Sequence, residues 1–163
     1  MRKFALVAAL AAFSATPAYA SGGARVEIQL GYDDIGGESG VTYGSVLGYD
    51  MDIGSTAFAG VEVGIANTTI KELGVTADRE LSVSGRFGVE VSEQAKIYAL
   101  LGYSNQRFSA PGLGGSNLDG IRVGAGYEHD IAKNLYGKVE YRYTNYELGV
   151  ERHSVVAGLG ARF

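Results

Sequence analysis

From Arg25 to the C-terminus, apolar and polar residues alternate with a period of two, which is the period of a β-strand. The clearest stretch is the last one, in which every second residue from Val155 to Phe163 is apolar. Five other stretches alternate as regularly, and two, residues 41–50 and 95–108, alternate less regularly. The pattern predicts eight strands of roughly 9–14 residues, a length that crosses a membrane when the strands are tilted.

The connections between the predicted strands alternate in length. Short turns are expected at residues 50–55, 92–94 and 129–134, and longer loops at residues 33–40, 67–78 and 109–118. The last connection, near residues 145–152, is intermediate. Tight turns at one end and long loops at the other are typical of an up-and-down barrel with two different poles.

The two faces of the predicted strands indicate a membrane barrel rather than a soluble one. The apolar face carries no charge between the strand ends, as contact with lipid requires, whereas the other face is rich in Gly and Ser. The interior of an eight-stranded barrel is only wide enough for side chains, so charges buried there need partners of opposite sign. Six acidic and six basic residues lie on the polar face, namely Glu27, Glu62, Glu80, Glu90, Glu128 and Glu140, and Arg25, Arg86, Arg122, Lys138, Arg142 and Arg162.

Tyrosines lie near the ends of the predicted strands, where a membrane barrel has its aromatic girdles. They are Tyr32, Tyr43, Tyr49, Tyr103, Tyr127, Tyr136, Tyr143 and Tyr146. Together with the alternation, they predict an all-β fold, an eight-stranded antiparallel up-and-down transmembrane β-barrel.

The first twenty residues have the features of a secretory signal peptide. Arg2 and Lys3 precede ten apolar residues, 4–13, which are too few to span a bilayer as a helix. Ala18 and Ala20 then supply the small residues of a cleavage site. The sequence thus predicts a cleavable signal peptide over residues 1–20 and a barrel domain over residues 21–163.

Composition excludes several classes of protein. The chain has no Cys, which excludes disulfides, a Cys-ligated zinc site and a thiol nucleophile. Its formal net charge is −4 and it has no basic block, so the electrostatic footprint of a nucleic-acid-binding protein is missing. We expect no nucleic-acid partner.

The charges of the polar face predict a network in the lumen. Its expected members are Glu62, Arg86, Arg122, Glu128, Lys138, Glu140 and Arg142. If the last loop is centred on Gly149, Glu140 lies opposite Gly158 and Lys138 opposite Gly160, so that the glycines leave space for the long side chains. Arg86 and Glu62 are expected at a similar depth on neighbouring strands. The network would be either a salt-bridged plug or the lining of a narrow ion path.

The chain resembles the small outer-membrane barrels of Gram-negative bacteria, that is, the OmpA membrane domain, the OmpX and Ail group and the opacity-type porin family. The segments IYALLGYSNQRF, GIRVGAGYEHDI and YGKVEYRYTNYELG, with the final AGLGARF, carry the resemblance. It implies a monomer in the bacterial outer membrane that contacts lipid and lipopolysaccharide. It also implies insertion by the barrel-assembly machinery, with Phe163 as the C-terminal assembly signal.

By the same resemblance, the expected function is that of a non-enzymatic component of the envelope and cell surface, with extracellular loops that interact with a host or surface ligand. The alternatives are a narrow porin for small ions and a lipid A-modifying enzyme. Enzymes of that kind use a His and a Ser near the outer rim, but Ser154 directly follows His153, and adjacent strand residues point to opposite faces. His129 is expected in a turn. We therefore expect no catalytic residues, no metal and no cofactor.

Charged residues in the predicted loops offer two further hypotheses. Asp33, Asp34 and Glu38 could bind a divalent cation, although such clusters are usually solvated loops. Four basic residues lie in or near the outer loops, namely Lys71, Arg79, Arg107 and Arg152. They could bind the phosphates of lipopolysaccharide or simply face solvent.

The signal-peptide hypothesis predicts the start of the mature chain. Protein purified from the outer membrane should begin at Ser21, because cleavage follows Ala20. Mass spectrometry of the intact protein reads this directly. A protein that retains Met1 and fractionates with the aqueous contents of the cell would contradict it.

Overall fold

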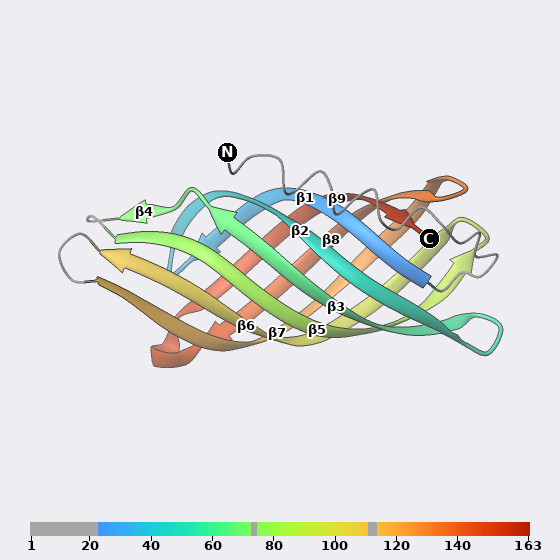
Figure 1. The fold of residues 1–163 in the computed structure, drawn as a ribbon. Helices are drawn as coiled ribbons and strands as arrows, with labels where there is room; N and C mark the ends of the chain where they lie inside the picture. The colour runs from blue at the N-terminus through green and yellow to red at the C-terminus, as the bar shows by residue number, and fades with distance from the viewer. Residues whose placement is uncertain (1–22, 73–74, 111–113) are drawn as a thin grey trace, which may run out of the picture.

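The computed structural model describes residues 23–72, 75–110 and 114–163, so the predicted signal peptide lies outside the described residues. These residues form a closed barrel of antiparallel strands (Figure 1). Its eight long strands are β1 (Gly23–Ile35), β2 (Glu38–Ile53), β3 (Ala57–Thr68), β5 (Val75–Ser92), β6 (Ala95–Ala110), β7 (Gly114–Ala132), β8 (Leu135–Tyr146) and β9 (Glu151–Arg162). The two-residue strand β4 (Lys71–Glu72) and the 3-10 turn η1 (Glu147–Gly149) complete the described elements. The expected eight-stranded antiparallel barrel is confirmed.

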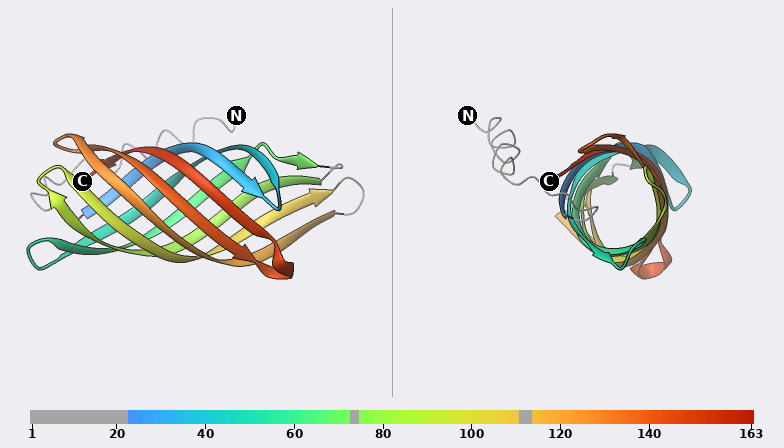
Figure 2. Two further views of the ribbon diagram at one scale, coloured as in Figure 1. Left: turned by 180° about the vertical axis from the view of Figure 1, so that it is seen from behind. Right: turned by 90° about the vertical axis from the view of Figure 1, so that its right-hand side faces the viewer.

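Each long strand pairs with the next in the chain, and the first pairs with the last. Strand β1 runs against β9 from Arg25↔Arg162 to Ile35↔Arg152, and β3 runs against β5 from Ala57↔Val89 to Asn67↔Arg79. Viewed along its axis, the barrel is a complete ring (Figure 2). Closure gives each of the eight long strands two hydrogen-bonded neighbours, which is the condition for a β-structure in lipid.

The barrel has its apolar face outside and its polar face inside. On β1, Ile28 and Leu30 are 65% and 61% exposed, whereas Glu27 between two outward positions is 1% exposed. The same alternation holds on the other strands, whose outward positions are mostly Val, Leu, Ile and Tyr. This is the reverse of a soluble barrel, and it is the arrangement that the sequence predicted. Among the residues that the structure describes, no helix has the length and hydropathy of a membrane span.

The strands extend further than the sequence predicted, because the hairpins continue past the apolar belt. The expected loop at residues 33–40 is a two-residue turn, in which Gly36 and Gly37 have φ values of 61° and 93°. Two successive positive φ values belong to the turn type that matches the twist of a hairpin, and Gly adopts them without strain. The expected long loop is therefore wrong, and Asp33 belongs to strand β1.

Two of the tyrosines assigned to the girdles point inward instead. Tyr136 and Tyr146 are buried in the lumen, as is Tyr98. Tyr136 is in phase with Lys138 and Glu140 on the polar face of β8, and a buried phenol is stable there because its hydroxyl has a charged partner. Five of the predicted girdle tyrosines are exposed on the outer face as expected, namely Tyr32, Tyr43, Tyr49, Tyr103 and Tyr127, and Tyr143 is half-buried.

The register of β8 against β9 differs by two residues from the prediction. Lys138 lies opposite Gly158, and Glu140 lies opposite Val156. The turn is centred on Leu148, which shares the left-handed region with Gly149, and Tyr146 N donates to Val150 O at 2.8 Å. A shift of two residues preserves which side chains face inward, so the charged face is unchanged.

This register can be tested with paired cysteines, because the chain has none of its own. Val139 and Ala157 lie directly opposite each other on the outer face, so the double variant V139C/A157C should form a disulfide under mild oxidation. The variant V139C/L159C tests the other register, since its cysteines are diagonal and roughly 7–8 Å apart. Counting free thiols by mass spectrometry distinguishes the two. Efficient closure of V139C/L159C alone would contradict the register.

Candidate functional site in the barrel lumen

Among the side chains that the structure describes, the lumen holds equal numbers of buried cations and buried carboxylates. The buried cations are Arg25, Arg86, Lys96, Arg122, Lys138, Arg142 and Arg152, and the buried carboxylates are Glu27, Asp33, Asp50, Glu62, Glu80, Glu128 and Glu140. All seven residues of the predicted network are among them. Four others, Asp33, Asp50, Lys96 and Arg152, were not predicted to face the lumen. Glu90 and Arg162, at the short-turn end, are only partly exposed.

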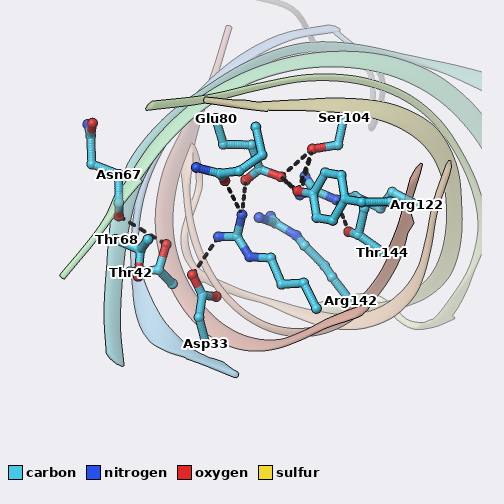
Figure 3. Close-up of polar contacts among 12 residues, drawn as sticks. Asp33, Thr42, Asn67, Thr68, Glu80, Ser104, Arg122, Arg142 and Thr144 are labelled. Atoms are coloured by element: carbon cyan, nitrogen blue, oxygen red, sulfur yellow. Dashed lines mark hydrogen bonds and ion pairs between the residues drawn. The ribbon is translucent and has the colours of Figure 1, made fainter. Parts of the chain in front are cut away.

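The half of the lumen nearer the long loops holds an outer cluster of two acids and two arginines, Asp33, Glu80, Arg122 and Arg152. Arg152 bridges both carboxylates, with Nη2 at 2.5 Å from Asp33 Oδ2 and Nη1 at 3.0 Å from Glu80 Oε2. The other oxygen of Glu80 pairs with Arg122. Figure 3 shows Asp33, Glu80 and Arg122 of this cluster extending from different strands into the lumen. The cluster is neutral as a whole.

Neutral groups complete the outer cluster. Tyr146 donates its hydroxyl to Glu80 Oε1 at 3.0 Å, and Ser104 donates to the same oxygen. Arg122 Nε donates to Thr144 Oγ1 at 3.1 Å, and Arg152 Nη1 donates to Gln106 Oε1 at 2.9 Å. Hydrogen bonds between charged groups and such partners are among the stronger ones in proteins, so they fix the rotamers of the two arginines.

The other half holds an inner cluster built around Glu140. Its carboxylate pairs with Arg142, lies 3.1 Å from Lys138 Nζ and accepts the hydroxyl of Tyr98 at 2.5 Å. Lys138 Nζ also lies 2.8 Å from Glu27 Oε1. The pairing is compatible with the small residue across the strand, since a Cβ on Gly158 would lie 3.1 Å from Lys138 Cε. A Cβ on Gly158 would also lie 2.9 Å from Glu27 Oε1, so the space left by this glycine is used by Glu27 and Lys138 and not by Glu140.

Two further arginines extend the inner cluster toward the short turns. Arg25 pairs with Glu62 and lies 3.4 Å from Asp50. Arg86 lies 3.3 Å from Asp50 and 3.0 Å from Glu128. Arg86 and Glu62 are on neighbouring strands, but Arg86 is opposite Gly60, and Asp50 is the acid that the two arginines share.

Aromatic rings surround Arg86. Its guanidinium lies 4.9 Å from the ring centre of Phe58 and 4.2 Å from that of Tyr98. Phe58, Tyr98 and Leu100 form a small apolar cluster inside the lumen. The sequence reasoning missed Phe58 and Leu100, although the irregular phase of residues 95–108 was a sign that apolar side chains lie on both faces there.

The structure separates the residues that a His–Ser catalytic pair would need. His153 is on the outer surface, where its Nδ1 lies 2.7 Å from the hydroxyl of Tyr141, while Ser154 is buried in the lumen. His129 is close to Tyr127 at the opposite rim. Among the described residues, no three His, Cys, Asp or Glu side chains form a group that could hold a metal ion.

Two of the loop hypotheses are corrected. Arg152 cannot meet lipopolysaccharide, because it is 2% exposed and belongs to the outer cluster. Asp33 is not part of a solvated acidic loop, because it is fully buried against the same arginine. Both residues lie on the inward face of long hairpins that the sequence reasoning had ended too early.

Comparison with known proteins identifies a family whose model matches this chain. The family model of the outer membrane protein beta-barrel domain matches residues 4–163. Ail of Yersinia pestis superposes with a TM-score of 0.64 at 18% identity, covering 87% of this chain and 97% of Ail. Neisserial surface protein A superposes with a TM-score of 0.60 at 16% identity, covering 88% and 98%. No curated protein sequence matches the chain.

A third structure is also similar. The N-terminal β-barrel domain of OprF from Pseudomonas aeruginosa superposes with a TM-score of 0.56 at 16% identity, covering 85% of this chain and 98% of that domain. At these identities the likeness concerns the fold.

Glu140 provides the test of the inner cluster. The variant Glu140→Gln keeps the shape of the side chain but leaves Lys138 and Arg142 without their shared anion, so it should lower the free energy of unfolding by about 3–5 kcal/mol. The readout is the temperature at which the compact band on detergent gels converts to the unfolded band. Val139→Ala, the outward neighbour, is the control and should shift this temperature less. Equal shifts would mean that Glu140 is hydrated rather than paired.

Proposed function

The chain belongs to the outer membrane protein beta-barrel domain family and is a protein of the bacterial outer membrane, and from this premise we propose that it is a monomeric, non-enzymatic barrel with a closed lumen. Its role is to stabilise the envelope and to present its loops at the cell surface. The observation that carries the proposal is the pairing of equal numbers of buried acids and bases throughout the lumen.

The proposed path to the membrane begins with a signal peptide over residues 1–20, which leaves residues 21–163 as the barrel. The two ends of the barrel, Gly23 and Arg162, lie at the end with the short turns, which in outer-membrane barrels faces the periplasm. The longer loops then face the medium. Phe163 is proposed as the signal read by the barrel-assembly machinery, and its backbone N donates to Ala24 O at 2.9 Å.

A closed lumen follows from the cost of separating buried charges. An ion that entered the lumen would have to displace paired groups such as Arg152 and Glu80 in the outer cluster, and Arg25 and Glu62 in the inner one. Breaking a buried pair costs several kcal/mol. The side chains of Phe58 and Leu100 add an apolar surface that cannot replace the hydration of the ion.

The absence of catalysis is supported by the separation of His153 from Ser154 across the barrel wall. General-base activation of a serine requires a hydrogen bond between the two side chains. A lipid A-modifying activity that depends on such a pair is therefore disfavoured.

The proposed contact surface consists of the outer loops. Ile35 and Ile70 form a buried apolar cluster with Phe108 and Val150 packed against it, so residues beside four different connections are held together. This shared contact supports a loop surface that binds as one unit. The similar barrel Ail was crystallised in complex with the heparin analogue sucrose octasulfate, so a ligand-binding role suits a barrel of this size.

Conductance measurements test the closed lumen. In planar bilayers the protein should produce no steady channel, whereas a large barrel such as a 16-stranded porin encloses water and conducts. Arg86→Ala removes the cation between Phe58 and Tyr98 and should give small, brief openings. Phe87→Ala, on the lipid side of the same strand, is the control and should stay silent. Steady conductance of the unmodified protein would favour the narrow-porin alternative instead.

A further inference from the structure

The outer wall of the barrel has a hollow of about 650 Å³ over strands β5 to β8. At its centre two alanines, Ala99 of β6 and Ala125 of β7, lie directly opposite each other and are exposed on the outer face. The same row continues to Phe87 on β5 and Tyr141 on β8, whose larger side chains are also exposed on that face. The hollow is therefore a groove with an alanine floor and two aromatic side walls, and we call it the wall groove.

The floor of the wall groove is sheet backbone covered only by the two alanine methyl groups. Gly88 and Gly126 also line it, and they are the cross-strand neighbours of Tyr98, whose ring is buried on the lumen side. A Cβ on Gly88 would lie 2.7 Å from Tyr98 Cβ, so a larger residue does not fit at this position. Because the floor consists of hydrogen-bonded strands, the groove is formed before a ligand binds.

Among the described residues that line the wall groove, no polar group is left to bind a ligand. The hydroxyl of Tyr141 lies 2.7 Å from His153 Nδ1, and that of Tyr127 lies 3.3 Å from His129 Nδ1. The hydroxyl of Tyr98 has its partner inside the lumen, and the backbone groups of the floor are paired between strands. A ligand can therefore make only van der Waals contacts in the groove, and this favours a hydrocarbon chain.

The wall groove lies in the half of the apolar belt that is nearer the short turns. The continuous run of exposed apolar positions on the outer face spans residues 97–103 on β6 and residues 121–127 on β7. Ala99 and Ala125 are each the second position of this run, counted from the end with the short turns. When the short turns face the periplasm, this half of the belt is in the periplasmic leaflet, which in a bacterial outer membrane consists of phospholipids.

A second copy of the chain does not fill the wall groove. Two copies related by a two-fold axis at this site would place groove against groove and enclose a void, and a void forfeits dispersion contacts. A single hydrocarbon chain that lies on Ala99 and Ala125 contacts the floor and also the rings of Phe87 and Tyr141. Because lipid tails are as apolar as the wall itself, this additional packing distinguishes a bound chain from the surrounding lipid.

We infer that the wall groove binds one acyl chain of a phospholipid in the periplasmic leaflet. The contacts are made with the chain, so the site selects for a hydrocarbon chain and not for a headgroup. The assignment to this leaflet rests on the proposed function, because it requires the short turns to face the periplasm. The chain site itself depends only on the shape and polarity of the groove.

Retention of lipid by protein extracted from the outer membrane in a mild detergent tests the site. Native mass spectrometry should find one phospholipid per barrel that stays bound after the other lipids are removed. The variant A99L/A125L fills the groove and should lose this lipid. V63F/V83F, which adds similar bulk at an exposed cross-strand pair elsewhere on the wall, should keep it. The compact band on unboiled detergent gels shows that each variant is folded.

The choice between chain and headgroup is tested with the same protein after delipidation. Phosphatidylethanolamine and phosphatidylglycerol with identical acyl chains should bind equally to the unmodified protein, and neither should bind to A99L/A125L. Equal retention of phospholipid by A99L/A125L and the unmodified protein would overturn the inference. Binding of only one of the two headgroups would overturn it as well, because it would indicate a headgroup site.

The position of the chain is tested on the unmodified protein in vesicles with a phospholipid that carries a diazirine in one acyl chain. After illumination, crosslinks mapped by peptide mass spectrometry should concentrate on residues 87–89, 97–99 and 125–127. Crosslinks spread evenly around the wall would contradict the chain site. Failure of an impermeant thiol reagent to label L148C on intact cells would contradict the proposed orientation instead, so the two failures are distinguishable.

Discussion

The narrow bore of an eight-stranded barrel is the constraint on which the other features of this protein depend. A bore of this size excludes bulk water, so each side chain on the inward face must find its partners within the protein. This explains why acids and bases occur in equal number inside, and why Gly158 lies opposite Lys138. It also explains why buried tyrosines such as Tyr98 and Tyr136 donate their hydroxyls to carboxylates.

The same constraint relates the two faces of the wall. Because strand residues alternate, each inward charge such as Glu80 is followed by an outward residue that meets lipid or headgroup. Arg79 and Arg107 are outward because Glu80 and Gln106 are inward. The lumen network and the composition of the outer face are thus two consequences of one register, and a substitution that shifted β5 against β6 would disturb both.

The fold could be predicted from the sequence, and so could the apolar outer face and the polar inner face of the barrel. Each follows from the period of two, which is a local property of every strand. The membership of the lumen network was partly predictable for the same reason, and Glu140 and Arg142 are examples. Partners were less predictable, because they depend on strand register, and register depends on turns. The turn at Leu148 and Gly149, both of which have left-handed φ values, gives β8 and β9 a pairing that differs by two positions from the predicted one.

Residues near strand ends were the least predictable. The sequence predicts loops at Asp33 and Arg152, because Asp33 lies close to Gly36 and Gly37, Arg152 lies close to Gly149, and charged residues flank both sets of glycines. In the structure both residues belong to strands, Asp33 to β1 and Arg152 to β9, and both side chains point inward, where they pair. Tyr136 and Tyr146 were likewise assigned by their distance from the strand end, whereas their phase relative to Lys138 and Thr144 decides their side.

The central claim is that the lumen is closed by its own side chains, and the reactivity of a single cysteine tests it most directly. Val156 is 1% exposed in the middle of the lumen, and the natural chain has no thiol. In V156C, a small charged methanethiosulfonate reagent should fail to label the folded protein in a bilayer and should label it fully after heat unfolding. L148C, at a loop position that is 91% exposed, should react at once. Rapid labelling of folded V156C would mean that the lumen is open to water and ions, and would contradict the account.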